Sequence, residues 1–403
     1  MKKIVVLGGA GGMGSVAVKD LTLNGKFDGI VIADANEQAA KQVANEIGSE
    51  KVSIAKIDVS DETALVDLLR EATVVLNFIG PFYKFGPLVI RAALATKTHY
   101  VDICDDYDAA EAILAMDDKA KKAGITVLTG MGTSPGITNV FARMGIDELD
   151  VAEEIDTIWV MGEAETGTAV LYHVFHGGSG YIPGFDQGKR TMIQPFGKEG
   201  SLTVEFPNPL GRVTVYDIGH PEPITIPHFF PEIRKVTNKG TLLPPKVIET
   251  FKSLIQLGFG SEEPIQIDHK IKISPRDFVV KFLQARPDLL DVDHPFGFGG
   301  LKVIVKGKKD GENVSYVYTT ASNESTGEST GIPAAVGAEL IATEKINKRG
   351  VIAPEVLDPK VVLKALGNRK RLNQHVKSTG IIIEKVFADG TIETIKAGRT
   401  IYN

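Results

Sequence analysis

Seven residues near the start of the chain carry the clearest chemical signal, because five of them are glycines at a spacing that suits phosphate binding. The pattern G-x-G-x-x-G occurs directly after a short apolar run at 4–7 and before a predicted helix at 15–23. Glycine permits a tight turn and lets backbone N–H groups approach a pyrophosphate at the helix N-terminus. The pattern favours a dinucleotide-binding loop over a glycine turn without a ligand. The predicted cofactor contacts of this loop are Gly9, Gly11, Gly12, Met13 and Gly14.

A carboxylate ends the next apolar run, 20 residues after the last glycine of this loop. At this position Asp34 can accept hydrogen bonds from the adenosine ribose hydroxyls, and it would repel a 2′-phosphate. Ala35 and Asn36 follow it and supply no arginine to offset that repulsion. The sequence therefore favours NAD as the cofactor over NADP. The alternative is an aspartate that only caps the following helix.

Two further segments follow predicted strands, and the carboxyl ends of parallel strands face the ligand crevice. The segment 77–82 can run along the cofactor, or it can be a simple exit from the strand. The segment 130–139 contains a predicted helix start that could hold a carboxylate or the carboxamide of nicotinamide, or it can be an ordinary capped helix. The predicted cofactor contacts are Asn77, Gly80 and Pro81, and the predicted substrate contacts are Ser134, Pro135, Gly136 and Asn139.

Residues 168–176 place polar side chains at helical spacing. The apolar residues fall on one side of the predicted helix, and the other side carries Tyr172, His173 and His176. A histidine that faces a cleft can donate or accept a proton near neutral pH. Two histidines three residues apart could also bind a metal, but no third ligand is evident nearby, so we predict no metal site. A solvated polar face is the remaining alternative.

Composition and charge exclude several classes of function. The chain has 403 residues, 43% hydrophobic and 24% charged, which is typical of a globular protein. Its net charge of −6 and the lack of a Lys/Arg run disfavour nucleic acid as a partner. No window approaches about 18 apolar residues, so we expect no membrane span, and the single cysteine, Cys104, fits a reducing, cytoplasmic location. Neither Tyr-x-x-x-Lys nor G-x-S-x-G occurs, which argues against short-chain dehydrogenase and serine-hydrolase chemistry.

The elements that would position these residues alternate over residues 1–130. Near-continuous apolar runs are typical of strands buried on both faces, and the helical stretches between them suit the crossovers of a parallel sheet. We therefore predict an α/β fold with a doubly wound, Rossmann-type parallel sheet. The predicted strands are 4–7, 30–33, 52–57, 74–78, 100–103 and 126–128, and the predicted helices are 15–23, 37–47, 62–69, 87–95 and 109–123.

The alternation ends near residue 150, and the pattern beyond it favours an α+β domain. Asp-Gly pairs at 310–311 and 389–390 predict two hairpins. A Pro-rich stretch at 221–231 predicts a surface loop, and 333–346 predicts an amphipathic helix. The few helices expected within 151–330 would leave one face of a sheet uncovered, which predicts a symmetric homodimer. The predicted strands here are 157–161, 201–206, 212–216, 303–305 and 315–319.

Several motifs, taken together, resemble the saccharopine dehydrogenase family. They are VVLNFIGPF at 74–82, THYVD at 98–102, GITV at 124–127 and SPGITN at 134–139, with TGIPAA at 330–335 and GVIAPE at 350–355 similar to the family's C-terminal motifs. The resemblance implies three parts of the chain. They are a Rossmann domain over 1–135, an inserted α+β substrate-binding and dimerisation domain over 136–330, and C-terminal helices and a hairpin over 331–403 that partly return to the Rossmann domain.

The resemblance also implies hydride transfer between NAD(P) and a carbon–nitrogen bond of an amino-acid-derived secondary amine or imine. We predict Asp102, at the end of a strand, as the general base, and His176 or His173 as the second choice. Arg190 or Arg212 could clamp a substrate carboxylate. Tyr172 completes the predicted substrate contacts. Two alternatives stay open: dehydrogenation of a primary amine such as that of lysine, and a non-catalytic NAD sensor.

Overall fold

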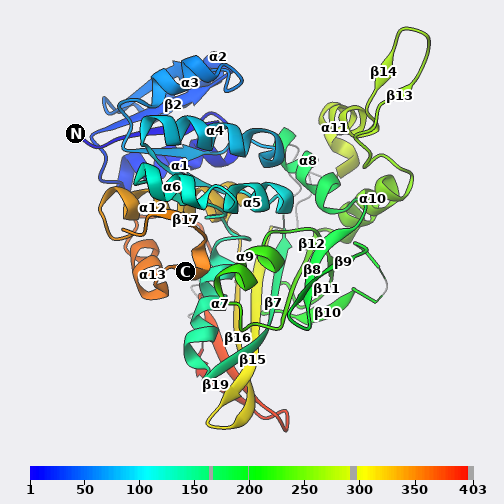
Figure 1. Ribbon diagram of the computed structural model, residues 1–403. Coiled ribbons are helices and arrows are strands. Elements are labelled where there is room, and N and C mark those ends of the chain that lie inside the picture. The colour runs from blue at the N-terminus through cyan, green and yellow to red at the C-terminus, as the bar shows by residue number, and fades with distance from the viewer. Residues whose placement is uncertain (163–166, 198, 291–296, 398–403) are drawn as a thin grey trace. The chain divides into compact units, whose positions relative to one another are not determined.

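The computed structural model describes residues 1–162, 167–197, 199–290 and 297–397 (Figure 1). The chain divides into two compact units, and each is built from two stretches of sequence. The N-terminal unit comprises Met1–Arg143 and Ser325–His375, and the central unit comprises Met144–Glu324 and Val376–Asn403. Among the described residues, no helix has the length and apolar character needed to cross a membrane. The substrate-binding and dimerisation roles of residues 136–330 stay predictions.

A seven-stranded parallel sheet lies at the centre of the N-terminal unit. The strand order is β17-β6-β5-β4-β1-β2-β3, so the direction of winding reverses between β1 and β4. This doubly wound order confirms the predicted Rossmann-type α/β fold, whose ligand crevice lies at that reversal. The strands are β1 (Lys3–Leu7), β2 (Gly29–Asp34), β3 (Val52–Lys56), β4 (Val74–Asn77), β5 (His99–Asp102), β6 (Thr126–Leu128) and β17 (Gly350–Ile352).

Helices connect these strands at the predicted places, with a few different bounds. The first helix begins at Gly12, within the glycine run, and the helix predicted at 109–123 is divided in two. The helices are α1 (Gly12–Asn24), α2 (Glu37–Ile47), α3 (Glu62–Leu69), α4 (Phe82–Thr96), α5 (Tyr107–Leu114), α6 (Asp117–Ala123), α7 (Ile137–Glu148), α12 (Thr326–Ala342) and α13 (Pro359–Gly367).

Helix α12 is buried around most of its circumference, so the amphipathic helix predicted at 333–346 is wrong in both its start and its character. The helix begins at a capping box formed by Ser325 and Glu328. It then packs against α1, β4, β5 and α13, which leaves it no solvated face. Small residues allow the close approach to α1: a Cβ on Gly331 would lie 2.6 Å from the carbonyl oxygen of Met13.

A buried ion pair also ties the second stretch of this unit to the first. The Arg369 guanidinium, just after α13, lies 2.8 Å from Asp20 on α1 and 2.9 Å from Glu339 on α12. Burial raises the pKa of Asp20 to about 6, because removal from water disfavours the carboxylate more than Arg369 favours it. The TGIPAA motif of α12 therefore packs directly on the helix that follows the glycine loop, and Arg369 joins both helices.

The central unit is built on a mixed ten-stranded sheet. The path is β10-β11-β12-β7-β15-β16-β18-β19, with β8 and β9 paired beside β12, and only β12 and β7 are parallel. Both predicted Asp-Gly hairpins are confirmed, one between β15 and β16 and one between β18 and β19. The strands are β7 (Val151–Met161), β8 (Ile182–Asp186), β9 (Lys189–Ile193), β10 (Leu202–Glu205), β11 (Arg212–Asp217), β12 (Lys235–Leu242), β15 (Gly299–Lys309), β16 (Glu312–Ser322), β18 (Ile382–Phe387) and β19 (Ile392–Lys396), and a separate small pair is β13 (Ile265–Gln266) with β14 (Lys272–Ile273).

Four α-helices of this unit are α8 (Thr168–Gly177), α9 (Glu222–Phe229), α10 (Pro245–Gln256) and α11 (Pro275–Ala285). The surface loop predicted at 221–231 is wrong, because α9 occupies it. Proline in the first helical turn loses no hydrogen bond, since the N–H groups there have no partner within the helix. Glu222, Pro223, Thr225 and Ile226 of α9 are buried.

Candidate functional site

The glycine loop between β1 and α1 has a shape that only glycine permits. Gly8 has φ +70°, and the Gly11 N–H donates to the Gly8 carbonyl at 3.0 Å. A Cβ on Gly14 would lie 2.2 Å from that same carbonyl oxygen. Helix α1 begins at Gly12 without an acidic residue in its first turn, so its positive end carries no competing carboxylate. A dinucleotide pyrophosphate fits this loop, and the contacts predicted for its glycines and Met13 stay predictions.

The Asp34 side chain is hydrogen-bonded to the glycine loop. Its carboxylate accepts hydrogen bonds from the N–H of Ala10 at 3.1 Å and from the N–H of Asn36 at 2.9 Å. Helix α2 is capped by the Asn36 side chain, which accepts from the N–H of Ala39. Asp34 is therefore placed beside the loop, as an adenosine ribose contact requires. Lys56 is its register partner on β3, a nearby cation that the sequence interpretation did not consider.

Asp102 ends β5 and is 0% exposed. Its Oδ1 accepts hydrogen bonds from the backbone N–H groups of Cys104 and Gly130 and from the Thr129 hydroxyl, at 2.8–3.1 Å. Its Oδ2 accepts from the Tyr100 hydroxyl at 2.8 Å. Burial raises the pKa of Asp102 to about 6, against the opposing effect of these donors. Four donors from its own unit thus surround this carboxylate, which favours a role in holding β5 and β6 together over direct contact with substrate.

Asn77, at the end of β4, belongs to the same buried network. Its amide donates to the Tyr100 hydroxyl at 3.1 Å, and its oxygen accepts from the N–H of Ile79 at 3.0 Å. These bonds fix the turn that leads to Gly80 and Pro81. Cofactor contacts of Asn77, Gly80 and Pro81 stay predictions. The two hydrogen bonds of Asn77 also give it a structural role, because they hold the turn after β4.

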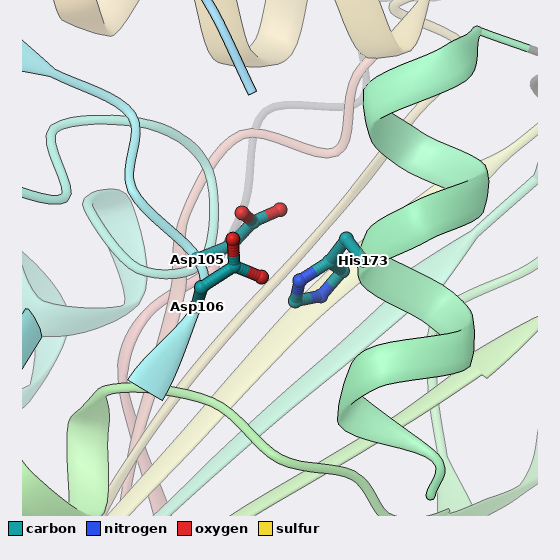
Figure 2. Close-up of side chains that lie close together, drawn as sticks. All are labelled: Asp105, Asp106 and His173. Carbon is teal, nitrogen blue, oxygen red and sulfur yellow. The ribbon is translucent and has the colours of Figure 1, made fainter. Parts of the chain in front are cut away.

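Two aspartates follow β5 and lie beside each other in Figure 2. Asp106 is buried, and its carboxylate accepts from the N–H of Phe82 at 2.8 Å, at the start of α4. Asp105 is partly exposed. The sequence interpretation missed both, although adjacent carboxylates after a parallel strand are a signal for the ligand edge of such a sheet.

The segment 134–139 is joined to the C-terminal motif by a buried hydrogen bond. Asn139 is fully buried, and its amide donates to Glu355 Oε2 at 2.9 Å, while its oxygen accepts from the N–H of Gly136 at 2.9 Å. This contact joins SPGITN to GVIAPE within the N-terminal unit. It gives Asn139 a structural role, and substrate contacts of Ser134, Pro135, Gly136 and Asn139 stay predictions.

Helix α8 confirms the helix predicted at 168–176, and Figure 2 shows His173 projecting from it. Tyr172 donates to Asp277 Oδ1 at 2.5 Å, and partial burial raises its pKa to about 12. His176 Nδ1 lies 3.4 Å from the Arg276 guanidinium. The catalytic roles of His173 and His176 and the substrate contact of Tyr172 stay predictions.

A second buried histidine contacts His173. His220 Nε2 lies 3.3 Å from His173 Nε2, and His220 Nδ1 lies 3.3 Å from Glu222 Oε2. His220 and Glu222 are 3% and 0% exposed. The sequence analysis missed this pair, because the Pro-rich pattern at 221–231 predicts a surface loop for Glu222, although a carboxylate two residues after a histidine is a visible signal.

Neither predicted arginine clamp is placed in a buried site. Arg212 has a side chain that is 77% exposed, and it faces Glu205 across the β10–β11 pair at 4.0 Å. Arg190 is also exposed, on β9. A buried cation in this unit is Arg276, which donates to the carbonyl of Gly260 and pairs with Glu262 at 3.1 Å. The exposure of Arg212 favours a cross-strand surface pair, and both clamp roles stay predictions.

Two family models match most of this chain. A model of the saccharopine dehydrogenase NADP binding domain matches residues 4–128, and a model of the saccharopine dehydrogenase C-terminal domain matches residues 181–374. Carboxynorspermidine synthase of Vibrio alginolyticus is 26% identical over 408 residues, covering 89% of this chain and 93% of that protein. Carboxyaminopropylagmatine dehydrogenase of Synechocystis is 23% identical over 400 residues, covering 91% and 96%. Apo saccharopine dehydrogenase (L-Glu forming) of Saccharomyces cerevisiae has the same fold, with a TM-score of 0.67, 17% identity, and coverage of 98% of this chain and 100% of that one.

Proposed function

Because this chain belongs to the saccharopine dehydrogenase family, we propose that it is an oxidoreductase that transfers a hydride between NAD(P) and a carbon–nitrogen bond of an amino-acid-derived secondary amine. The observation that carries the proposal is the glycine loop at the start of α1, which lies within the segment that matches an NADP binding domain. A loop closed by Gly8, Gly11 and Gly14 at the start of a helix has a shape that suits a pyrophosphate.

The two relatives that match over most of their length suggest the class of substrate. Both names, carboxynorspermidine and carboxyaminopropylagmatine, describe a polyamine or agmatine chain with a carboxyl group. We propose a carboxyalkylated amine as the substrate. In the oxidative direction the carbon beside nitrogen loses a hydride, the nitrogen loses a proton, and water hydrolyses the imine to an amine and a carbonyl compound. In the reverse direction the amine and the carbonyl compound condense to the imine, which the hydride then reduces.

The bound nicotinamide would supply or accept the hydride. A side chain of the protein must accept the proton of the substrate amine, or donate it in the reverse direction. We propose His173 for proton transfer and reassign Asp102, our first choice from the sequence, to a positioning role. The four donors around Asp102 hold its carboxylate within the sheet edge. His173 instead stands on a helix of the central unit, with one ring nitrogen directed at His220. This contact holds the His173 ring in a defined orientation, and a histidine ring can accept or donate a proton near neutral pH.

Turnover assays test the proposal directly. We expect the purified protein to oxidise NADH or NADPH when a diamine or agmatine is supplied with a carbonyl compound that bears a carboxyl group. Saccharopine and lysine, each supplied with the oxidised cofactor, are assayed as the alternative substrates. Faster turnover of lysine would favour a primary-amine dehydrogenase. Tight cofactor binding without oxidation or reduction of any amine would contradict the proposal and favour a sensor.

We further propose that NAD binds more tightly than NADP, although the matching family model is named for NADP. A 2′-phosphate carries about two negative charges, and at about 4 Å from the Asp34 carboxylate each costs on the order of 1–4 kcal/mol. We therefore expect NAD to bind at least about tenfold more tightly, which needs only about 1.4 kcal/mol. Asp34→Ser combined with Ala35→Arg should reverse the preference, as measured by calorimetric titration of both cofactors.

Two variants control this measurement. Glu37→Gln removes a neighbouring carboxylate that pairs with Lys41 on α2, and it should leave the preference unchanged. Lys56→Gln removes the cation across the strand pair, and it should strengthen the discrimination against NADP. Equal or tighter binding of NADP by the unchanged protein would refute this interpretation of Asp34.

The homodimer and the cytoplasmic location stay predictions.

A further inference from the structure

We propose that Tyr100 is a positioning residue for the cofactor, because its hydroxyl ties the turn 78–81, which follows β4, to a fixed carboxylate at the end of β5. This inference rests on the proposed function, since it assigns Tyr100 a task in cofactor binding. The Tyr100 side chain is 0% exposed and lies in the middle of the parallel sheet. Its hydroxyl contacts Asn77 on one side and Asp102 on the other.

The carboxylate of Asp102 sets the direction of each hydrogen bond in this row. Above its pKa of about 6, Asp102 is ionised and only accepts, so the Tyr100 hydroxyl donates its single proton to Oδ2 at 2.8 Å. Burial raises the pKa of Tyr100 well above its ordinary value, so the phenol keeps that proton. The phenol oxygen then accepts from the Asn77 amide at 3.1 Å. Asn77 must therefore direct its oxygen to the other side, where the N–H of Ile79 donates to it at 3.0 Å.

The turn that Asn77 holds lies against the glycine loop. A Cβ on Gly8 would lie 3.2 Å from the Ile79 side chain and 3.2 Å from the carbonyl carbon of Phe78. The end of the turn is also held by a residue that follows β5, because the Asp106 carboxylate accepts from the N–H of Phe82 at 2.8 Å. A displaced Ile79 would therefore disturb the loop that we expect to bind the pyrophosphate.

Asp102 is a fixed anchor for this row even without Tyr100. Its Oδ1 accepts from the N–H groups of Cys104 and Gly130 and from the Thr129 hydroxyl, and none of these three bonds involves the phenol. The backbone of Asp102 adds a further tie, since its carbonyl accepts from the N–H of Met131 at 2.8 Å. Loss of the Tyr100 hydroxyl should thus release the turn after β4 and leave the segment after β6 in place.

This difference predicts how Tyr100→Phe changes cofactor binding. The variant keeps the buried ring, but the Asn77 amide loses its acceptor, and conformations in which Asn77 no longer holds Ile79 become populated. A cofactor that binds only the ordered turn then has an apparent affinity reduced in proportion to the ordered fraction. We expect a loss of about tenfold, which is within the range for one buried hydrogen bond.

Calorimetric titration of NAD and NADP into Tyr100→Phe measures this loss without turnover, after circular dichroism has checked the fold. In steady-state assays the KM of the cofactor should rise by the same factor, with kcat and the KM of the amine changed less than about threefold. A simple loss of folded protein would instead lower kcat and leave the KM of the cofactor unchanged. Hydrogen exchange adds a readout without cofactor, because the Ile79 amide should exchange at least about tenfold faster in the variant.

Thr98→Val is the matched control, because it removes another buried hydroxyl at the opposite end of the same strand. The Thr98 hydroxyl donates to the carbonyl of Leu69 at 2.9 Å, just before β5 begins. This variant should unfold at a lower urea concentration but bind the cofactor with unchanged affinity. Unchanged affinity in Tyr100→Phe, or an equal loss in Thr98→Val, would overturn the proposal.

The unchanged protein supplies a test that needs no variant. Saturating NAD should slow hydrogen exchange at the Ile79 amide, and an exchange rate that does not respond would overturn the proposal. Failure of the unchanged protein to bind either NAD or NADP would overturn it as well. If the cofactor binds and Tyr100→Phe weakens it as expected, but no amine is turned over, only the hydride transfer of the proposed function fails.

Discussion

Replacement of His173 by glutamine is expected to lower kcat by about 100- to 10,000-fold, the range that general acid–base catalysis typically contributes. Glutamine has nearly the reach of histidine and can still hydrogen-bond to His220, but its amide cannot accept a proton near neutral pH. Cofactor affinity should change by less than about threefold, because the glycine loop belongs to the other unit and is unaltered. Single-turnover and steady-state rates with a saturating amine give the measurement.

His228→Gln is the matched control for this prediction, since it makes the same substitution at an exposed histidine of the same unit, at the end of α9. It should retain full kcat. His176→Gln should lower kcat less than His173→Gln, because the proposed function assigns proton transfer to His173. A His173→Gln enzyme within about tenfold of the unchanged rate would remove His173 from proton transfer. A larger loss in His176→Gln would assign that step to His176.

Local sequence patterns predicted the fold of the N-terminal unit well, because a buried parallel sheet leaves a strong signal. Each strand is a short apolar run, and each crossover is a helix with its own start and stop residues. The glycine loop was predictable for the same reason, since a positive φ at Gly8 and the close approach of Gly14 to Gly8 require glycine. These features depend on residues that are neighbours in the chain.

The parts that sequence could not predict depend on contacts between distant residues. The apparent amphipathic character of α12 came from counting one apolar side, whereas the contact of Gly331 with α1 buries the opposite side as well. His220 contacts His173, which lies 47 residues earlier in the chain on α8, so no local pattern could indicate this contact. Asp102 ends its strand as expected, but the donors that enclose it include residues 129 and 130, beyond the next strand. Position at a strand end was therefore a poor guide to exposure.

Replacement of Asp102 by alanine is expected to lower the free energy of unfolding by more than about 3 kcal/mol, because it removes the acceptor of four buried donors at once. Each buried donor left without a partner costs roughly 1–3 kcal/mol. Urea unfolding followed by circular dichroism measures the loss. Asp61→Ala is the comparison, since it removes an exposed carboxylate that only caps α3, and it should cost about 1 kcal/mol.

Asp102→Asn separates the charge of this group from its hydrogen bonds. The folded pKa of about 6 lies above the ordinary value of 3.8, so the folded state binds more protons than the unfolded state between about pH 4 and pH 6. Asp102 therefore makes its largest contribution to stability below about pH 4, and that contribution falls as pH rises through 6, by roughly 3 kcal/mol in total. The unfolding free energy of the unchanged protein minus that of Asp102→Asn should fall by nearly that amount between pH 3 and pH 7. Asp20 has a similarly raised pKa but is present in both proteins, so its effect cancels in the difference.

The same variant decides between the two roles considered for Asp102. If Asp102 only positions β5 and β6, Asp102→Asn should keep kcat within about tenfold, since the amide oxygen can still accept from Thr129 and Gly130. A loss of about a thousandfold in a variant with unchanged circular dichroism and cofactor affinity would restore Asp102 as the general base. A difference in unfolding free energy that does not change with pH would show that burial does not raise the pKa of Asp102 in the folded protein. The enclosure argues against both outcomes, because a carboxylate that is 0% exposed and accepts four hydrogen bonds from its own unit is shielded from solvent.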